Sequence, residues 1–434
     1  MTYGIDLGTT YSLIGSGDEL YSGLVSSSVD LNKKQQCDRR LVGSHIKSGY
    51  KVNMTIGASG EVPIKCSSII LKELAKQAFE KTGEEVKDVI ISVPAKFSHT
   101  QRLAVLQAGA EAGLNVKGVI NEPTAAAVYC CMDKPGLYLV FDLGGGTFDV
   151  SIVSVDASSI RVLSTDGLST LAGNNFDRTV LERIFSKNRI QVRYKTEVAV
   201  QEVLANIQQA KEDFQKCGEP QVISLAPFMS DAEYVLDKEE YLAAMQVFRP
   251  TIQLCKVLLA SLMDIEKPEL LFVGGSTACP YLRKWVAKEL QLDVIEHDVQ
   301  PDMLVAKGVA KYAWLNQNGY NIVQDVTKQL SIADSRGVSQ PIIFQDTPVP
   351  AMGELLLTNS EEASFMEFDL YQGDDCIASK NDYIGTLAFD FGEMLPQGAG
   401  VVNVTITVDI NGIVNLSGMD LRTGQTQSIQ LKVR

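Results

Sequence analysis

The amino-acid sequence predicts an α/β protein that ends in an all-β domain, and three observations carry this prediction. Up to about residue 319, buried strands alternate with amphipathic helices, a pattern typical of sheets flanked by helices. Strands ending on Asp6 and Asp142 each lead into a glycine turn, so the chain carries nearly the same short motif twice. Beyond Gly319 helical periodicity disappears, and residues 402–408 alternate with period two before an Asn-Gly hairpin turn.

The length of the chain predicts more than one domain. At 434 residues it exceeds what one hydrophobic core usually supports, and 45% apolar residues are enough to bury several. We expect an α/β part over residues 1–319, a linker over 320–327 and a β-domain over 328–434. The linker is placed by residues 321–325, which separate the last helical pattern from the first strand of the β-domain.

Local signals place the next helices and strands of the α/β part in order. Ser68 is a candidate N-cap for a helix with apolar residues at helical spacing, which Gly83 would end. Residues 86–93 follow as a buried strand. Ser98 with Gln101 three residues later forms a capping-box pattern, which predicts the start of another helix.

The charge and the histidines exclude several classes of function. The 39 basic and 53 acidic residues give a net charge of −14, which opposes binding to a phosphate backbone, so we expect no nucleic-acid partner. The three histidines, His45, His99 and His297, show no paired spacing. A zinc site or a Ser-His-Asp triad is therefore disfavoured, and we interpret all three as solvated surface residues.

Cysteine usage and the first residues predict the compartment. Eight cysteines show no C-x-x-C spacing in a chain far longer than disulfide-stapled domains, so we interpret them as reduced thiols. Strand-like sequence begins by Tyr3, which leaves no room for a signal segment, and no apolar run approaches membrane-spanning length. We therefore expect a cytoplasmic protein without a membrane partner.

Three glycine turns form the candidate functional site. Residues 4–10 and 141–147 each place an aspartate at a strand end before such a turn. Glycines let backbone N–H groups approach an anion, and the aspartate can hold a hydrated divalent cation against it. Residues 274–277 make a third turn that leads into a helix with Pro280 near its start. One such turn is more often a plain chain reversal, but the ordered set predicts a polyphosphate clamp.

This ordered set resembles the phosphate-1, phosphate-2 and adenosine motifs of the actin, sugar-kinase and 70-kilodalton heat-shock superfamily. The heat-shock branch is indicated by residues 91–97, 101–102, 120–127 and 142–150. Its peptide-binding sandwich is matched by residues 349–350, 371–373 and 409–413. The chain is therefore identified as a member of the DnaK-type chaperone family, with residues 15–66 the weakest part of the resemblance. The resemblance implies an actin-like ATPase with duplicated, ribonuclease-H-like lobes, followed by an all-β peptide-binding sandwich.

The same resemblance implies roles for individual residues. Asp6 and Asp142 would hold Mg²⁺ through water. The residues that would bind ATP or ADP are Gly8, Thr9, Thr10, Tyr11, Gly144, Gly145, Gly146, Lys211, Gly274, Gly275 and Ser276. Those that would serve hydrolysis are Arg39, Glu122, Asp142, Thr147 and Asp149. Pro94 and Arg102 would relay the nucleotide state to the β-domain. The peptide groove there would be lined by Leu357, Met366 and Phe368.

Departures from the family pattern affect the expected activity. Arg39 stands where the family has a catalytic lysine, so hydrolysis is expected to be slowed or lost. Ala278 replaces an arginine that stacks on adenine, and Gln208 replaces a glutamate of the same pocket, so adenosine should bind more weakly. Gly118 replaces an arginine that J-domain proteins use, which puts that partnership in doubt.

The β-domain and the linker also depart from the pattern. The linker offers only Ile322 and Val323 in place of a run of leucines, so coupling between the domains should be softer. Residues 334–337 are short where a loop would bridge the peptide groove. No helical lid follows the last strand, which contains Ile429, so we expect fast peptide release.

We expect an ATP-binding chaperone with slow hydrolysis that binds extended apolar segments of unfolded or nascent polypeptides through main-chain hydrogen bonds and an apolar pocket. A J-domain protein, an exchange factor or a ribosome-associated protein would be its partner. The first alternative is a non-hydrolysing, nucleotide-binding co-chaperone that modulates another chaperone or nascent-chain handling. The second is a small-molecule kinase, which the β-domain disfavours. Without the resemblance, the alternating apolar residues of that domain could simply fill a sandwich core.

Overall fold

The computed structural model describes most of the chain, and the structural statements below refer to that part. The described residues are 1–8, 10–27, 29–30, 35–36, 61–97, 99–156, 159–188, 190, 196–262, 267–319, 329–345, 347, 349–409 and 412–430. The predictions for Thr9, Arg39 and the linker at 320–327 lie outside these residues.

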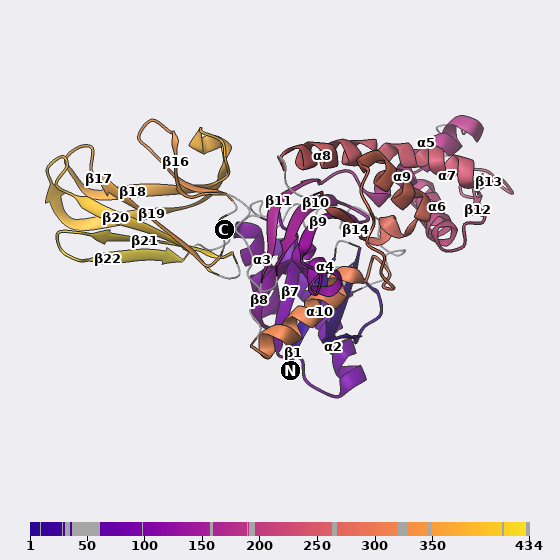
Figure 1. Ribbon diagram of the computed structural model, residues 1–434, viewed down its shortest axis with the longest axis horizontal. Helices are drawn as coiled ribbons and strands as arrows, with labels where there is room; N and C mark the ends of the chain where they lie inside the picture. The colour runs from indigo at the N-terminus through magenta and orange to yellow at the C-terminus, as the bar shows by residue number, and fades with distance from the viewer. Residues whose placement is uncertain are drawn as a thin grey trace.

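The first lobe is built on a mixed sheet with the strand order β3-β2-β1-β7-β8 (Figure 1). These strands are β1 (Thr2–Leu7), β2 (Tyr11–Ser16), β3 (Glu19–Leu20), β7 (Asp88–Val93) and β8 (Asn115–Asn121). β4 (Val25–Ser26) also pairs with β2, and β5 (Val29–Asp30) pairs separately with β6 (Gln35–Gln36). β1 runs antiparallel to β2 and parallel to β7, and β7 runs parallel to β8.

Helices cover both faces of this sheet. α2 (Glu61–Thr82) and α3 (His99–Glu111) pack on the face that carries Tyr3, Ile5 and Leu7 of β1. α4 (Glu122–Cys130) and α10 (Leu304–Gln317) pack on the other face, where Gly4 of β1 meets the backbone of α10. Successive side chains of a strand point to opposite faces, so the buried runs in β1 serve two hydrophobic layers.

The second lobe repeats the plan around a sheet of order β11-β10-β9-β14. These strands are β9 (Gly136–Leu143), β10 (Phe148–Val155), β11 (Ile160–Leu168) and β14 (Glu269–Val273). Its helices are α5 (Gly173–Asn188), α6 (Glu197–Cys217), α7 (Lys238–Met245), α8 (Arg249–Ala260) and α9 (Pro280–Leu290). A hairpin of β12 (Gln221–Ser224) and β13 (Glu233–Leu236) and the short 3-10 turns η4 (Gln246–Phe248) and η5 (Gly275–Ala278) complete it.

The two lobes share one local arrangement, which confirms the repeat seen in the sequence. β1 and β9 each end at a glycine turn, and each then pairs antiparallel with the next strand, β2 or β10. On its other side each pairs parallel with a later strand, β7 or β14. The two aspartate-glycine turns therefore occupy equivalent places in the two sheets.

The last part of the described chain is a β-sandwich (Figure 1). One sheet has the order β16-β15-β18-β19 and the other β17-β20-β21-β22. The strands are β15 (Leu330–Ala333), β16 (Ser339–Ile343), β17 (Ala351–Thr358), β18 (Ala363–Gln372), β19 (Asp382–Leu395), β20 (Val401–Val408), β21 (Val414–Asp420) and β22 (Thr426–Gln430), with a 3-10 turn η6 (Ala378–Lys380) between β18 and β19. Alternate residues of β18, β19 and β20 form the core between the sheets.

Two local predictions are wrong. The helix expected to begin at Ser68 begins by Glu61, and the Ser68 hydroxyl donates 2.9 Å to the carbonyl of Lys65 inside the helix instead of capping it. His99, expected on the surface, is buried with 1% of its area exposed. The predicted strands at 86–93 and 402–408 are confirmed as β7 and β20.

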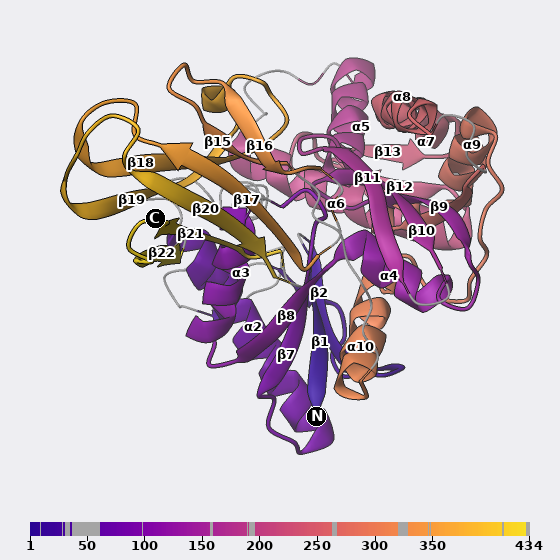
Figure 2. The same cartoon turned by 60° about the vertical axis from the view of Figure 1, so that its left-hand side comes forward.

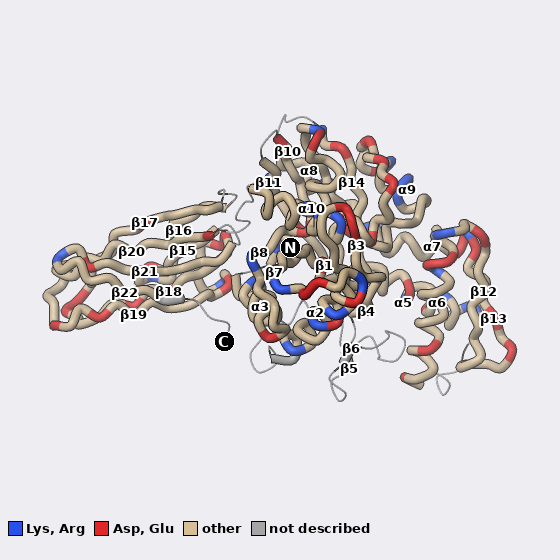
Figure 3. The backbone as a smooth tube through the Cα atoms, turned by 90° about the horizontal axis from the view of Figure 1, so that it is seen from below, with Lys and Arg blue, Asp and Glu red and all other residues tan. Residues whose placement is uncertain are grey.

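His99 is buried because the sandwich contacts the first lobe at the start of α3 (Figure 2). The backbone N–H of His99 donates 3.0 Å to Oε1 of Gln372, and the N–H of Val414 donates 3.0 Å to Nδ1 of His99. In the described part of the chain, Lys and Arg occur on the lobes and on the sandwich, interspersed with Asp and Glu (Figure 3). No helix within the described ranges is long and apolar enough to span a membrane.

Candidate functional site

The three predicted glycine turns meet between the two lobes. A Cβ atom added to Gly145 in the second turn would clash with the Thr10 hydroxyl of the first turn. Ser276 of the third turn donates its hydroxyl 2.9 Å to the carbonyl oxygen of Gly144. The turns after β1, β9 and β14, far apart in the sequence, therefore face one another, as the ordered set predicts.

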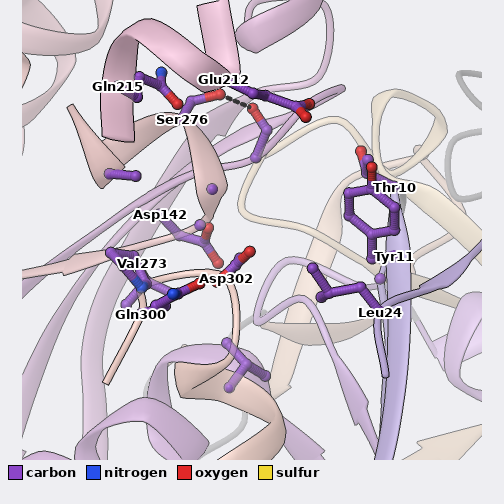
Figure 4. Close-up of a pocket in the computed structure, with 18 of the residues that line it drawn as sticks. Thr10, Tyr11, Leu24, Asp142, Glu212, Gln215, Val273, Ser276, Gln300 and Asp302 are labelled. Atoms are coloured by element: carbon purple, nitrogen blue, oxygen red, sulfur yellow. Dashed lines mark hydrogen bonds between the residues drawn. The ribbon is translucent and has the colours of Figure 1, made fainter. Parts of the chain in front are cut away.

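A cavity of about 710 Å³ opens between these turns. In Figure 4, Asp142 and Asp302 point into it from one side, and Thr10 and Tyr11 line the facing side. The predicted residues that line it are Asp6, Gly8, Thr10, Tyr11, Glu122, Asp142, Gly144, Gly145, Thr147, Lys211, Gly274, Gly275 and Ser276. Gly146 and Asp149 are not among its lining residues. Most of the candidate site is thus assembled around one volume large enough for a nucleotide.

Glycine is required at several of these positions. A Cβ on Gly8 would fall on the carbonyl oxygen of Tyr11. Gly274 has a φ of +83°, and a Cβ there would lie 2.6 Å from a carboxylate oxygen of Asp142. The close approach at both positions and the positive φ of Gly274 therefore exclude larger side chains from these turns.

Carboxylates approach the cavity from both lobes. Asp6 at the end of β1 is 8% exposed, and the Ser92 hydroxyl donates 2.6 Å to its Oδ1. Glu122 lines the cavity from the first turn of α4. Asp142 lies directly opposite Asp149 in the antiparallel pair of β9 and β10. Within the described part of the chain no three His, Cys, Asp or Glu side chains form a cluster that could hold a metal ion directly.

Lys211 lines the cavity, but its ammonium group is engaged within the second lobe. Nζ lies 2.7 Å from Oδ1 of Asp177 and donates 3.3 Å to the carbonyl of Gly173. Lys211 and Asp177 are 7% and 5% exposed, so this is a buried ion pair. The pair joins α5 to α6 and fixes the wall of the cavity.

Sequence reasoning missed one wall of the cavity. Residues 298–302 line it just before α10, and Arg283 lines it from α9. Burial raises the pKa of the Asp302 carboxyl group, and its Oδ1 has no hydrogen-bond partner among the described residues. The Pro-Asp pair at 301–302 before a helical pattern was the one local signal available, and it marks a turn without indicating a ligand site.

Of the predicted relay residues Pro94 and Arg102, Arg102 lies at the contact with the sandwich, where it packs against Gly412. Pro94 is buried after β7, and its carbonyl accepts the N–H of Phe97 at 3.0 Å. Arg102 on α3 donates 2.6 Å to Oδ1 of Asn121, the residue before Glu122. Burial lowers the pKa of Arg102 to about 10, while Asp409 of the sandwich acts in the opposite direction. Arg102 thus connects the sandwich side of α3 with the residue next to the cavity.

The three predicted groove residues differ in burial. Phe368 on β18 is 2% exposed and belongs to the core of the sandwich, where it pairs in register with Leu387 of β19. Leu357 and Met366 are partly buried against the same core. Phe368 is therefore more deeply buried in the sandwich than Leu357 and Met366.

The fold and the site define a class of protein: two actin-like lobes with a cavity lined by three glycine turns between them, followed by a β-sandwich. A model of the family described as Hsp70 protein matches residues 32–434. The chaperone protein DnaK of Mycoplasma mobile is 28% identical over 472 residues, covering 99% of this chain and 78% of that protein. The chaperone protein DnaK of Deinococcus proteolyticus is 30% identical over 405 residues, covering 88% of this chain and 64% of that protein. The chain belongs to the Hsp70 family.

Proposed function

We propose that this protein is a chaperone that binds ATP or ADP with Mg²⁺ between its lobes and extended apolar peptide segments in its sandwich. The observation that carries the proposal is the meeting of three glycine turns around one cavity. Turns without Cβ atoms let a phosphate approach the backbone closely, and Asp6 and Asp142 suit a hydrated Mg²⁺. Membership of the Hsp70 family and the names of both relatives support this assignment.

The cavity also supports slow hydrolysis of ATP. Glu122 and Asp142 line it and can orient water and the hydrated metal, and Thr147 lines it from the second phosphate turn. Such an arrangement acts by positioning the water and stabilising charge on the transferred phosphoryl group. Asp149 would contribute from the opposing strand position, and Arg39 would act in place of a lysine.

Peptide binding would be coupled to the nucleotide through α3. Arg102 reaches Asn121, which precedes Glu122 in the chain, while its helix contacts Gln372 and Val414 of the sandwich through His99. The clients would be unfolded or nascent polypeptides, and a J-domain protein or an exchange factor would be a partner. The free thiols of all seven described cysteines suit a reducing cytoplasm.

A second candidate is a nucleotide-binding module that does not hydrolyse ATP and modulates another chaperone. Ala278 in the cavity and Arg39 in the chain favour it, because both depart from the family pattern. Single-turnover hydrolysis at saturating Mg-ATP separates the two: measurable turnover supports the first candidate, and tight binding without turnover supports the second.

The proposal is tested by calorimetry of ATP binding with and without Mg²⁺. The full chain should bind ATP more tightly with the metal. Asp142→Asn should weaken this Mg-dependent binding by about tenfold, because a neutral amide replaces the charged carboxylate that orients the cation. Asp18→Asn, at an exposed turn outside the cavity, is the matched control and should bind as the wild type does. Absence of ATP binding by the folded wild-type protein would reject the proposal.

A further inference from the structure

Arg283 lies at an unexpected place in the cavity wall. It belongs to the first turns of α9 and lines the cavity together with Ala278, five residues earlier. Its Nε donates 2.8 Å to the carbonyl of Thr277, the residue directly before Ala278. Its guanidinium carbon lies 5.8 Å from the centre of the Phe272 ring. Two contacts therefore hold this guanidinium group beside the small side chain of Ala278.

We propose that Arg283 forms the surface on which the purine base of the nucleotide stacks. This inference rests on the proposed function and adds to it a residue that determines how the base is held. A guanidinium group is planar, weakly hydrated and positively charged, and it stacks well on aromatic rings. Ala278 leaves the space beside the Thr277 carbonyl open, and the guanidinium tied to that carbonyl is placed to fill it.

The position of the glycine turns indicates which end of the cavity receives the base. The three turns lie together, because Gly145 of the second turn contacts Thr10 of the first and Ser276 of the third bonds to the second. This cluster of turns suits the phosphates. From Ser276 the same chain segment continues through Ala278 into α9, so Arg283 stands beyond the phosphate end. A base bound there would extend from the turns toward Arg283.

Helix α6 brings to the cavity polar groups of the kind that a purine edge needs. Gln208, Glu212 and Gln215 line the cavity from α6, and Gln208 donates 2.6 Å to Glu212. Amide and carboxylate groups can pair with ring nitrogens and exocyclic groups of a base, while the opposite surface stacks on its face. A base slot between α6 and Arg283 therefore combines an edge-recognising wall with a stacking wall.

The groups around Arg283 leave it available as a cation. Within the described residues, the side chain of Arg283 makes one hydrogen bond, from Nε to the carbonyl of Thr277. Burial lowers the pKa of Arg283, and Glu296 opposes that effect. Burial and the charge of Arg283 lower the pKa of His297, which favours the neutral form of this neighbour.

The experiment compares Mg-ATP with Mg-tripolyphosphate, which has the phosphate chain but no base, by competition calorimetry on the full chain. Arg283→Ala should weaken ATP binding by about tenfold, because a stacked cation contributes about 1 kcal/mol, and should change tripolyphosphate binding by less than about twofold. Arg283→Lys, which keeps the charge without the plane, should restore only part of the loss. The double variant Arg283→Ala/Ala278→Arg, which returns a guanidinium to the same wall from the neighbouring position, should recover most of it.

Several outcomes would overturn the inference. It fails if Arg283→Ala binds ATP as the wild type does, or if it loses ATP and tripolyphosphate equally, which would mean that Arg283 only supports the fold of the wall. It also fails if wild-type protein binds both ligands with the same affinity, although the polyphosphate clamp of the proposed function would then stand. If the folded wild-type protein binds neither ligand, both the proposed function and this inference are rejected.

Discussion

Lys211 illustrates how a residue can belong to a site without offering its charge to a ligand. Its ammonium group lies against Asp177 and the Gly173 carbonyl, and it also lies 5.9 Å from the centre of the Phe176 ring. Breaking a buried ion pair by removing one partner leaves the other charge without compensation, which costs much more than the pair itself contributes. The role of Lys211 is therefore first structural.

Lys211→Met should lower the free energy of unfolding by about 3 kcal/mol, because the Asp177 carboxylate stays buried without its cation. The double variant Lys211→Met/Asp177→Asn removes both charges and should recover more than half of this loss. Urea denaturation followed by circular dichroism measures both. A loss below about 1 kcal/mol in the single variant, or no recovery in the double variant, would contradict the structural role.

At this scale the sequence predicts the residues whose role is local. Asp6, Asp142 and the glycines of the turns are recognisable because each acts within its own strand and turn. Arg283 and Asp302 are not, because a helix and a loop from elsewhere in the chain bring them to the cavity. The ion pair between Lys211 of α6 and Asp177 of α5 could not be predicted from a local pattern either, because its partners lie on different helices.

The packing of α4 against α10 decides how the elements around the site are held. Gly308 of α10 lies so close to α4 that a Cβ atom would overlap the carbonyl of Ala125. α4 begins at Glu122 and α10 follows Asp302, and both of these residues line the cavity. The close approach of the two helices therefore sets the positions of two cavity residues that come from distant parts of the sequence.

Gly308→Ala should lower the free energy of unfolding by about 2 kcal/mol, because the overpacking of the helix contact outweighs the better helix propensity of alanine. It should also weaken Mg-ATP binding, since Glu122 and Asp302 would shift. Gly23→Ala is the matched control, because Gly23 has open space around it and should tolerate the substitution. Thermal unfolding and ATP calorimetry test both variants; equal effects of the two substitutions would contradict the argument.

The elements themselves were predictable where periodicity and breakers agree. β7 and β20 match their predicted ranges to within two residues. A short buried apolar run between breakers and a strict period-two alternation both favour a strand over a helix. The start of α2 was missed by seven residues or more, because Ser68 looks like an N-cap when only its neighbours are considered. Its hydroxyl finds the Lys65 carbonyl only once the helix exists.

At the scale of the whole molecule, the contact between the sandwich and the first lobe is what the sequence could not give. His99 and Gln372 are 273 positions apart, and His99 and Val414 are 315 apart. No local pattern relates them, so His99 was interpreted as a surface residue. Gly412 also packs on Arg102: a Cβ atom added to this glycine would lie 3.4 Å from Nε of the guanidinium group. Gly412, just before β21, therefore contacts α3.

His99→Ala should favour separation of the sandwich from the lobes, because the Val414 N–H would lose its acceptor in a buried contact. An unsatisfied buried donor costs about 1 to 3 kcal/mol, which shifts a docking equilibrium by about tenfold or more. Small-angle X-ray scattering of the full chain should then give a larger radius of gyration than the wild type. His99→Asn is the matched variant, since its side-chain oxygen can take the place of Nδ1 and should keep the compact arrangement.

The backbone hydrogen bond from His99 to Gln372 remains in both variants, so the difference between them isolates the side-chain acceptor. If the alanine and asparagine variants scatter alike, the Val414 hydrogen bond does not hold the sandwich on the lobe. If the radius of gyration rises only in the alanine variant, the side chain of His99 on α3 holds the sandwich against the first lobe. Arg102, three residues further along the same helix, would then be positioned to transmit a displacement of α3 to Asn121 at the edge of the cavity.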